Sequence, residues 1–377
     1  MKVVVATDSF KGSLSSMEAG NAIKRGIKQA HPYANVIVRP LADGGEGTVE
    51  ALVEGMNGTY HYVNVTNPLG QKVKACYGII ECTTAVIEIA SAAGITLIDT
   101  QEKNPMLTTT YGVGEIIIDA LSKGCRRFII GLGGSVTNDG GAGMLQALGF
   151  DLLDSQGQPI PQGAQGLKKL MTIHDTHVFP ELKKCDFLIA CDVNNPLCGP
   201  QGASAVYGPQ KGATPDMVKE LDDLLEHFSK ITKKYNSYAN PSLSGCGAAG
   251  GLGFAFFSFL QGQHHSGIKL ILKETHLESY LTDADLVITG EGRLDFQTAM
   301  GKAPIGVAQL AKKYHLPVIA FAGSVTENAI ECHQHGIDAF FPILREIITL
   351  DEAMLCDVAQ KNLTNTVEQV FRLWSLK

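Results

Sequence analysis

The 377-residue sequence lacks features that several large classes of protein require. No apolar run reaches the roughly 18 residues of a membrane-spanning helix, so we expect no membrane segment. Lysine and arginine number 31 against 38 acidic residues, which gives a net charge of −7. Because nucleic-acid binding needs a basic surface that neutralises phosphates, this balance argues against a nucleic-acid partner, although it leaves room for a local basic pocket.

The nine cysteines form no recognisable framework. Their number is odd, and no pair has the C-x-x-C spacing of many zinc sites and redox motifs. Disulfides persist mainly in oxidising compartments, so a scattered set of this kind is typical of reduced thiols. The cysteine pattern therefore predicts a cytoplasmic protein without a disulfide scaffold.

Several common catalytic motifs are also absent. The P-loop pattern G-x-x-x-x-G-K-[ST] does not occur, because Ala303 follows Gly301 and Lys302 and no glycine stands at the required offset. There is no G-x-S-x-G serine motif, no linked set of protein-kinase motifs and no histidine pair with zincin spacing. Residues 245–250 match G-x-G-x-x-G, but no clear strand precedes them, so they indicate a dinucleotide site only weakly.

Both ends of the chain alternate between apolar strands and helical patterns. At the start, strands at Val3–Thr7 and Val36–Pro40 flank an amphipathic helix at Ser16–Ala30. At the end, the expected strands are Leu286–Thr289, Val318–Ala322 and Ala339–Pro342, and the expected helices lie near Ala303–Tyr314, Glu327–His335 and Leu350–Leu373. This alternation is typical of a parallel sheet covered by helices.

The middle of the chain has a different pattern. Closely spaced strands at Tyr60–Thr66, Lys72–Ile80 and Ala85–Ile89, with turn residues between them, predict an antiparallel meander. We therefore expect an α/β fold in which both chain ends form a Rossmann-like parallel-sheet domain. A second α/β domain with a mixed sheet would be inserted into it. The expected domains are residues 1–66 with 275–377, and residues 67–274.

Charged and amide side chains follow five of the predicted strands. They are Asp8 and Lys11, Asp43 and Glu46, Asn138 and Asp139, Asp192 and Asn194, and Glu291, Arg293 and Asp295. In open α/β sheets, ligands bind at the carboxyl ends of strands, near a reversal of strand order. Aspartate and glycine are common in turns of any kind, but that explanation must then hold for five loops at once. The pattern favours a functional site.

Two glycine-rich loops each precede a predicted helix, at residues 131–143 and 245–253. Glycine lets backbone N–H groups approach an anion, and a helix N-terminus adds roughly half a positive charge, so phosphate fits both loops. Lys302 stands just before Pro304 at a helix start, where a cation is disfavoured unless an anion is present. The candidate phosphate-binding residues are Gly133, Gly134, Ser135, Gly140, Gly141, Gly250, Gly251 and Lys302.

The acidic residues of these loops are too numerous for a phosphate pocket without a cation. Mg²⁺ typically takes one or two carboxylates together with substrate phosphates. One acid could instead accept the proton of an attacking hydroxyl. Spacing alone does not decide which acid has which role.

The motifs taken together resemble the type I glycerate kinase family. The similar segments run through the whole chain in the family's order: DSFKGS (8–13), DGGEGT (43–48), GLGGSVTNDGGAG (131–143), CDVNNPLCGPQGAS (191–204), GAAGGLG (247–253), GEGRLDFQT (290–298) and GKAPIGVA (301–308). This resemblance implies ATP-dependent phosphorylation of D-glycerate with Mg²⁺ in the cytoplasm. The product would be 2-phosphoglycerate, with 3-phosphoglycerate as the competing possibility. It also implies a Rossmann-like domain of both chain ends with a second α/β domain inserted.

We assign roles on this basis as hypotheses. The glycine loops would hold the nucleotide phosphates. Lys11, Arg293 and Lys302 would hold the transferred phosphate or the glycerate carboxylate. The Mg²⁺ candidates are Asp43, Asp139 and Asp295, and the candidates for accepting the hydroxyl proton are Asp192 first and Asp8 second. The alternatives are a kinase of another small hydroxy acid, a hydroxy-acid dehydrogenase and a non-catalytic metabolite-binding protein. A homo-oligomer is possible.

Overall fold

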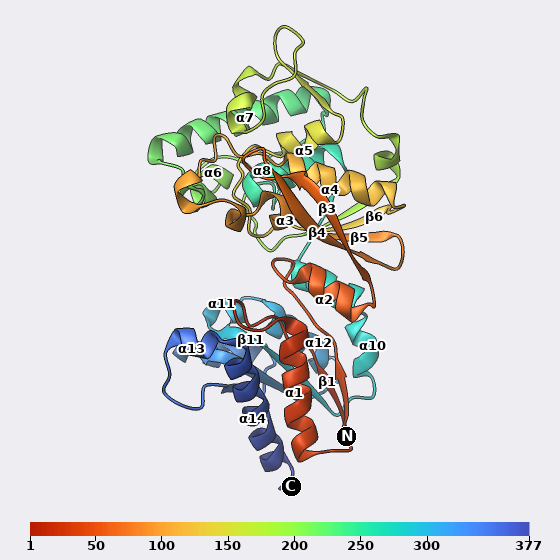
Figure 1. The fold of residues 1–377 in the computed structure, drawn as a ribbon, viewed down its shortest axis with the longest axis vertical. Coiled ribbons are helices and arrows are strands. Elements are labelled where there is room, and N and C mark those ends of the chain that lie inside the picture. Colours follow the sequence, from red (N-terminus) through yellow and green to blue (C-terminus); the bar gives the residue numbers. More distant parts are fainter. Residues whose placement is uncertain (377) are drawn as a thin grey trace. The chain divides into compact units, whose positions relative to one another are not determined.

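The computed structural model describes residues 1–376, which divide into two compact units (Figure 1). Unit 1 comprises residues 1–43, 50–57 and the chain from 268 onward, and unit 2 comprises residues 44–49 and 58–267. The chain passes from one unit to the other after residues 43 and 57, and also within the helices α2 (Thr48–Gly55) and α9 (Gly267–Glu274). Within residues 1–376, every helix is too short or too polar to span a bilayer.

Unit 1 is built on a parallel sheet of five strands. Their order is β13 (Ala339–Pro342), β12 (Val318–Val325), β11 (Leu286–Leu294), β1 (Lys2–Val5) and β2 (Asn35–Val38). In register, Val3 of β1 pairs with Leu286 on one side and with Val36 on the other. The chain proceeds from β1 to β2 in one direction and from β11 to β13 in the other. Strand order therefore reverses between β1 and β11, the position where open α/β sheets bind ligands.

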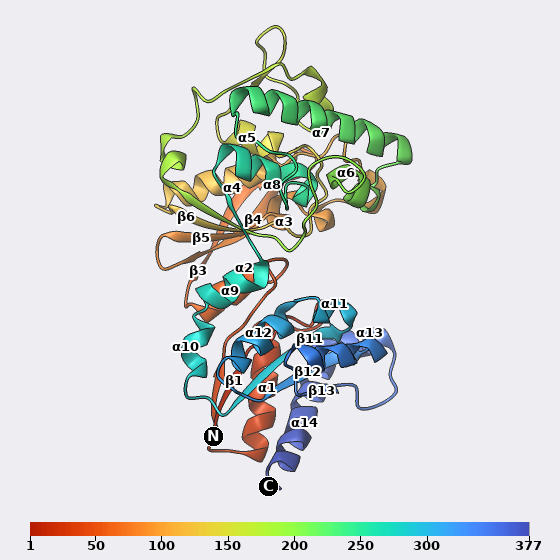
Figure 2. The ribbon, with the colours of Figure 1, turned by 180° about the vertical axis from the view of Figure 1, so that it is seen from behind.

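The sequence of β1 explains its central place. Val3, Val4 and Val5 are all completely buried, and an unbroken run of β-branched residues suits a parallel strand that is covered on both faces. On one face, α1 (Ser16–Ala30) packs beside α14 (Cys356–Trp374), and both ribbons lie side by side in Figures 1 and 2. A Cβ at Gly26 of α1 would lie only 2.3 Å from the carbonyl oxygen of Thr364, so glycine permits this close approach.

The remaining helices of unit 1 are short. They are α10 (Leu277–Leu281), α11 (Phe296–Ala299), α12 (Ala303–Lys312), α13 (Leu350–Met354) and the 3₁₀ segment η6 (Glu327–His335). The single helix expected over 350–373 is wrong. A capping box of Thr349 and Glu352 starts α13, and Leu355 adopts extended backbone (φ −61°, ψ 130°), which ends α13 and begins α14.

Unit 2 contains a mixed sheet of six strands. Their order is β10 (Gln263–His265), β9 (Asp186–Ala190), β6 (Arg127–Gly131), β5 (Thr84–Glu88), β4 (Lys72–Ile80) and β3 (Thr59–Thr66). The pairs β3–β4 and β4–β5 are antiparallel, and the others are parallel. The expected meander and the α/β class with one parallel and one mixed sheet are confirmed. The domain boundaries expected from the sequence assigned residues 59–66 to the domain formed by the chain ends. In the structure these residues form β3, which pairs with β4 in the sheet of unit 2. The domain boundaries stay a prediction.

Helices and short strands cover the sheet of unit 2. The α-helices are α3 (Ala90–Ala93), α4 (Tyr111–Ser122), α5 (Ala142–Ala147), α6 (Ala203–Tyr207), α7 (Pro215–Tyr235) and α8 (Ala248–Phe259). The 3₁₀ segments are η1 (Ile95–Leu97), η2 (Thr100–Glu102), η3 (Ala164–Lys169), η4 (Pro180–Lys184) and η5 (Pro209–Lys211), and β7 (Asp151–Leu153) pairs with β8 (Thr172–His174). Helix α7 begins with Pro215 directly after its cap Thr214, a position that suits proline because its missing N–H would be unpaired there anyway.

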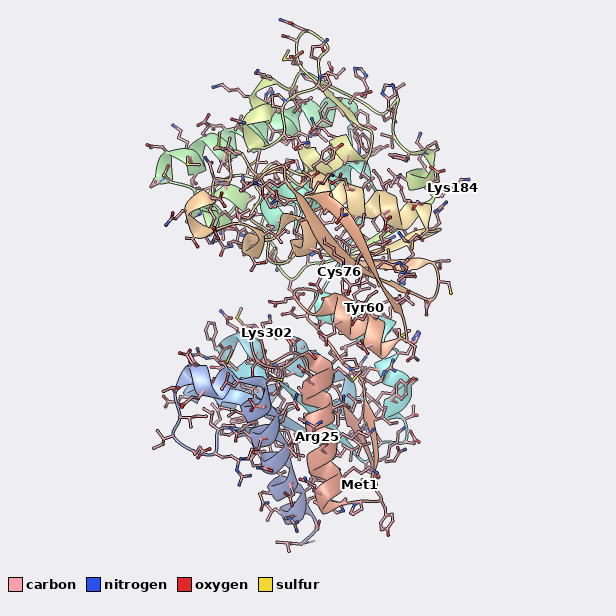
Figure 3. The ribbon with its side chains drawn as sticks, viewed as in Figure 1. Met1, Arg25, Tyr60, Cys76, Lys184 and Lys302 are labelled. Atoms are coloured by element: carbon pink, nitrogen blue, oxygen red, sulfur yellow. The ribbon has the colours of Figure 1, made fainter. Side chains whose placement is uncertain are left out.

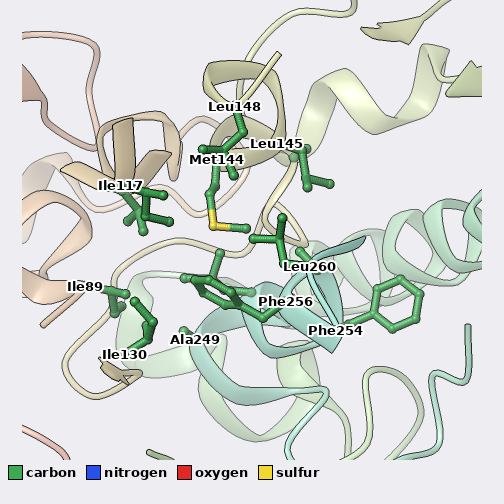
Figure 4. Packing of buried hydrophobic residues seen from close by; sticks show 14 of the residues in the cluster. Ile89, Ile117, Ile130, Met144, Leu145, Leu148, Ala249, Phe254, Phe256 and Leu260 are labelled. Atoms are coloured by element: carbon green, nitrogen blue, oxygen red, sulfur yellow. The ribbon is translucent and has the colours of Figure 1, made fainter. Parts of the chain in front are cut away.

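The core of unit 2 is rich in aromatic side chains. Phe128 and Phe187 stack with ring centres 4.8 Å apart, and Phe256 of α8 lies 5.9 Å from Phe187. Met144 and Leu145 of α5 belong to the same buried cluster (Figure 4). This packing fixes α5 and α8, and with them the two glycine-rich segments, which overlap the starts of these helices; within α8, Ala249, Gly250 and Gly251 have left-handed backbone.

Candidate functional site

Three acidic residues come from three neighbouring strands of unit 1. Asp8 follows β1, Asp43 follows β2, and Glu291 lies in β11. The loop after β1 is tied to β11, because the amide of Asp8 donates to the carbonyl of Gly290 at 2.9 Å. We call Asp8, Asp43, Glu291 and the neighbouring Lys11 the acidic cluster. It lies at the reversal of strand order between β1 and β11.

A hydroxyl at the start of α1 fixes the loops that carry the cluster. Ser16 Oγ donates to the carbonyl of Thr7 at 2.8 Å and accepts from the amide of Leu41 at 2.8 Å. The amide of Leu41 is also directed to Thr7 O at 3.1 Å. The loop after β1 and the loop after β2 are therefore joined two residues or fewer from Asp8 and Asp43.

Asp8 is the most deeply placed member of the acidic cluster. It is 3% exposed, and within residues 1–376 its carboxylate accepts a single hydrogen bond of 2.7 Å, from the amide of Ser9. Burial, followed by the negative charge of Asp43, raises the pKa of Asp8 from 3.8 to about 7. The carboxyl group therefore changes its charge near neutral pH, which is the range suited to a general base.

Lys11 brings a cation to these acids. Its Nζ lies 3.6 Å from Asp43 Oδ2, and its side chain remains 55% exposed. Burial opposes its charge, but the carboxylates of Asp43, Asp8 and Glu291 outweigh that effect and raise the pKa of Lys11. An ion pair that is exposed to water contributes little to stability. The ammonium group of Lys11 can therefore leave Asp43 and bind an anionic group of a ligand at little cost.

Glu291 and Arg293 lie within a strand, not after it. Strand β11 pairs with β12 as far as Leu294, which is five residues beyond the expected end. Glu291 is 7% exposed and accepts a hydrogen bond from Thr298 Oγ1. Burial raises its pKa, while the charge of Lys302 acts in the opposite direction. Glu291 was noted in the sequence without a role, and its contact with α11 was not foreseen.

Asp295, Arg293 and Lys302 surround the start of two helices. Asp295 Oδ1 accepts from the amides of Gln297 at 2.9 Å and Thr298 at 3.2 Å, so it caps α11. Arg293 Nε lies 3.8 Å from Asp295 Oδ2. Lys302, labelled in Figure 3, is the N-cap of α12, and its side chain makes no capping hydrogen bond to that helix. The expected position of Lys302 at a helix start is confirmed.

The glycine loop at 131–143 in unit 2 exposes only its beginning. Gly133 and Gly134 are exposed, whereas Ser135, Gly140 and Gly141 are buried. Neither amide of the Gly133–Gly134 pair donates a hydrogen bond within residues 1–376. Of the predicted phosphate-binding residues in this loop, these two are placed to meet a ligand.

The other glycines allow two loops to pack against one another. The amide of Gly140 donates to the carbonyl of Gly250 at 3.0 Å. A Cβ at Gly250 would lie 2.0 Å from the carbonyl oxygen of Thr137, and one at Gly251 would lie 2.8 Å from Gly140 Cα. Glycine is needed at these positions for close backbone packing, a reason that the sequence pattern does not distinguish from phosphate binding.

Asp139 is completely enclosed by this packing. Its Oδ1 accepts from the amide of Gly141 at 3.1 Å. Its Oδ2 accepts from the amide and hydroxyl of Thr110, both at 2.9 Å, and from the amide of Gly143 at 3.2 Å. Burial raises its pKa, and these four donors oppose the rise. The geometry favours a role in shaping the loop over contact with a metal ion.

Asp192 lies in the loop after β9 of unit 2. It is exposed, and its Oδ1 accepts from the amide of Gly267, the first residue of α9, at 2.9 Å. Across residues 1–376, no group of three or more His, Cys, Asp or Glu side chains is arranged to hold a metal ion. A site for Mg²⁺ would therefore need oxygen atoms from its substrates as well as from the protein.

The fold and the acidic cluster define an α/β protein whose candidate site lies at the carboxyl ends of parallel strands. A sequence model of the glycerate kinase family matches residues 3–375. The chain is 47% identical to "Glycerate kinase" of Haemophilus influenzae over 100% of both chains, and 48% identical to "Glycerate 2-kinase" of Escherichia coli over 94% and 93% of the chains.

A solved structure agrees with these matches. A crystal structure from Salmonella typhimurium LT2, provisionally named glycerate kinase 2, superposes with a TM-score of 0.92. It is 46% identical in sequence, and the match covers 100% of this chain and 98% of that one. The chain belongs to the glycerate kinase family, whose members are phosphotransferases that act on an alcohol group. The predicted function is confirmed at the level of the family.

Proposed function

We propose that this protein is a type I glycerate kinase that transfers the γ-phosphoryl group of ATP to the 2-hydroxyl of D-glycerate in the cytoplasm, giving 2-phosphoglycerate. The observation that carries the proposal is Asp8, a buried carboxyl group with a pKa of about 7 at the reversal of strand order. The name of the Escherichia coli relative, glycerate 2-kinase, supports the 2-phosphate over the 3-phosphate. The nine free thiols support a reducing compartment.

In the proposed reaction, the 2-hydroxyl oxygen attacks the γ-phosphorus while the bond from that phosphorus to the leaving oxygen of ADP breaks. The hydroxyl proton passes to a carboxylate oxygen of Asp8. Asp8 replaces Asp192 as the first candidate because it is buried and accepts only one hydrogen bond, whereas Asp192 is exposed and holds the first amide of α9. Phosphoryl transfer depends mainly on positioning and charge stabilisation.

The cations of unit 1 would hold the anionic groups of the substrates. Lys11, already facing carboxylates, would bind the carboxylate of glycerate or the transferred phosphoryl group. Arg293 would contribute its exposed guanidinium, and Lys302 would add positive charge at the start of α12. In unit 2, the exposed amides of Gly133 and Gly134 would receive nucleotide phosphates.

The acidic cluster fits Mg²⁺, since Mg²⁺ prefers hard carboxylate oxygens and the carboxylates of Asp43 and Glu291 lie close enough to Asp8 to raise its pKa. Asp43 is the proposed ligand because its side chain is 22% exposed and adjoins Asp8. Asp295 is a second candidate, although one of its oxygens caps α11. When bound, Mg²⁺ would neutralise charge on the phosphates.

Incubation with ATP, Mg²⁺ and D-glycerate, followed by phosphorus NMR, tests the proposal. We expect consumption of ATP and the resonance of 2-phosphoglycerate, with loss of turnover when Mg²⁺ is chelated. L-glycerate serves as the control substrate. Formation of 3-phosphoglycerate would refute the assigned position. Phosphorylation of a different hydroxy acid, or binding of glycerate without consumption of ATP, would refute the activity in favour of a different kinase or of a metabolite-binding protein.

A further inference from the structure

Lys211 is a buried cation that the sequence did not single out. It ends η5, is 2% exposed, and belongs to unit 2. Its position is rigid, because Gly212 adopts φ +93° and a Cβ there would lie 2.4 Å from the carbonyl oxygen of Lys103. The segment 208–212 has glycine at both ends of a short turn, which is the one sequence signal that could have drawn attention to it.

The buried ammonium group of Lys211 forms hydrogen bonds with the glycine loop at 131–143. Its Nζ donates to Ser135 Oγ at 2.9 Å and to the carbonyl of Thr137 at 2.7 Å. On the other side, the carbonyl of Gly134 accepts from the amide of Ile95 at 2.8 Å. These contacts fix residues 134, 135 and 137, directly beside the exposed amides of Gly133 and Gly134.

Stability alone does not explain a charge at this place. No carboxylate within residues 1–376 lies within 4.0 Å of Lys211 Nζ, so the ammonium group has no ion-pair partner. Burial lowers the pKa of Lys211 to about 7, although the field of Asp139 acts in the opposite direction. Burying an unpaired ion is unfavourable by several kcal/mol, and an apolar side chain of similar length would avoid this.

Two further polar atoms on the same stretch have unused hydrogen-bonding capacity. Thr137 Oγ1 and Asn138 Oδ1 are buried, and neither has a hydrogen-bond partner among residues 1–376. Asn138 is held in place by its amide group, which donates to Ser204 Oγ at 3.0 Å. Packing alone would favour apolar side chains here, so the polarity of the stretch points to a ligand-dependent role.

We propose that Lys211 is a positioning residue for the nucleotide: by bonding Ser135 and Thr137 it holds Gly133 and Gly134 in the conformation that receives phosphate oxygens, and its positive charge strengthens that binding. This inference rests on the nucleotide site of the proposed function. In this inference a buried cation outside the glycine loop supports phosphate binding. The cations expected from the sequence all lie in the candidate binding loops themselves.

The inference has a consequence for pH. A bound phosphate favours the charged ammonium, so binding near neutral pH would take up a proton, and affinity would fall as Lys211 loses its proton. The titratable side chains on the elements packed against it are Asp139 on the glycine loop, Tyr207 on α6 and Lys103 beside Gly212. Of these, Asp139 is the one whose charge acts on Lys211, and its carboxylate is held by four donors.

Titration of ADP into wild-type protein and into Lys211→Met tests the inference. Loss of a charge-assisted contact predicts about 10- to 100-fold weaker binding of ADP in the variant, with a higher KM for ATP and a KM for D-glycerate within about two-fold of wild type. In wild type the Kd for ADP should rise between about pH 7 and pH 9, where phosphate is already ionised, whereas in Lys211→Met it should stay flat. The exposed Lys219→Met is the matched control.

Wild-type affinity and pH dependence in a folded Lys211→Met variant would overturn the inference. Equal losses of affinity for ADP and D-glycerate, together with a lower Tm, would overturn it in favour of a purely structural role. If Lys211→Met does not fold, Ser135→Ala removes one of the two bonds of the ammonium group and should weaken ADP binding selectively; unchanged affinity there would count against the inference. A wild-type protein that binds ADP but does not phosphorylate glycerate would refute the proposed function alone.

Discussion

Each unit buries an aspartate after a parallel strand, but the two carboxyl groups are held in opposite ways. Asp139 of unit 2 is fully buried and accepts four hydrogen bonds from Thr110, Gly141 and Gly143. Asp8 of unit 1 is 3% exposed and accepts one, from Ser9. Both pKa values are raised by burial. The number of donors, and not burial, separates the two residues.

The difference shows how a buried aspartate after a parallel strand can either stabilise a loop or remain able to bind a ligand. A carboxylate whose oxygens are surrounded by fixed donors stabilises the loop that supplies them, and it has little capacity left for a ligand. A carboxylate with one donor retains acceptor capacity and responds to charges around it. Lys11 and Lys211 also differ in their surroundings. Lys11 is half exposed among acids, whereas Lys211 is buried and has no ion-pair partner within residues 1–376.

The largest effect on activity should follow from Asp8→Asn. Loss of a general base lowers kcat by about 10²–10⁴, while the removal of a buried, weakly bonded charge should leave Tm unchanged or higher. Because Asp8 must be ionised to accept a proton, wild-type kcat/KM should fall as pH drops through about 7. Steady-state kinetics across pH, with the exposed Asp283→Asn as control, provide the measurement. Near-normal kcat in Asp8→Asn would return Asp192 to first place.

Asp139→Ala should show the reverse pattern. Four donors would lose their acceptor inside the protein, which predicts a loss of about 3–5 kcal/mol in the free energy of unfolding. Urea denaturation followed by circular dichroism measures this change. A stable Asp139→Ala variant that needs much more Mg²⁺ for activity would instead support the metal role assigned from the sequence and would break the contrast with Asp8.

Lys11→Ala tests whether the exposed cation of the acidic cluster binds substrate. Loss of one charge-assisted hydrogen bond predicts a kcat/KM about 10- to 100-fold lower. Lys72→Ala is a suitable control, because Lys72 is 62% exposed and forms a comparable surface ion pair with Glu115. We expect the control to change kcat/KM by less than about two-fold, since exposed ion pairs contribute little. Equal effects of the two variants would remove Lys11 from the site.

The fold could be predicted where the sequence has a single physical explanation. Val3–Val5 reads as a buried strand because an unbroken β-branched run suits little else. The break at Leu355 could not be predicted, because leucine suits either backbone conformation and the capping box at Thr349 is compatible with a longer helix. The length of β11 depends on its pairing with β12, which is a long-range contact.

The site was predicted in its residue types more than in its geometry. Asp8, Lys11 and Asp43 were all named, since polar residues after apolar strands are visible in the sequence. Glycine was ambiguous: Gly133 and Gly134 are exposed, whereas Gly140 and Gly250 serve packing between loops, and only the contacts distinguish them. Lys211 was missed because burial of a lysine depends on segments more than 70 residues away.

Glu88 at the end of β5 is a partly buried carboxyl group whose hydrogen bonding is intermediate between that of Asp8 and that of Asp139. Its Oε1 accepts from the amide of Val49 at 2.8 Å, at the start of α2, and the neighbouring amides of Gly47 and Thr48 also act on it. Burial outweighs these donors and raises its pKa from 4.5 to about 7. Its contribution to stability is therefore complete below pH 4.5 and is lost as pH rises through about 7.

Glu88→Gln keeps an oxygen for the amide of Val49 but cannot ionise. The free energy of unfolding of Glu88→Gln, relative to wild type, should therefore increase between about pH 5 and pH 8, by roughly 1–3 kcal/mol. Comparing the two proteins at each pH cancels the titration of Asp8 and of other shared groups. Paired urea titrations provide the measurement, with the exposed Glu220→Gln as control. A difference that does not depend on pH would mean that the amides at the start of α2 keep Glu88 ionised.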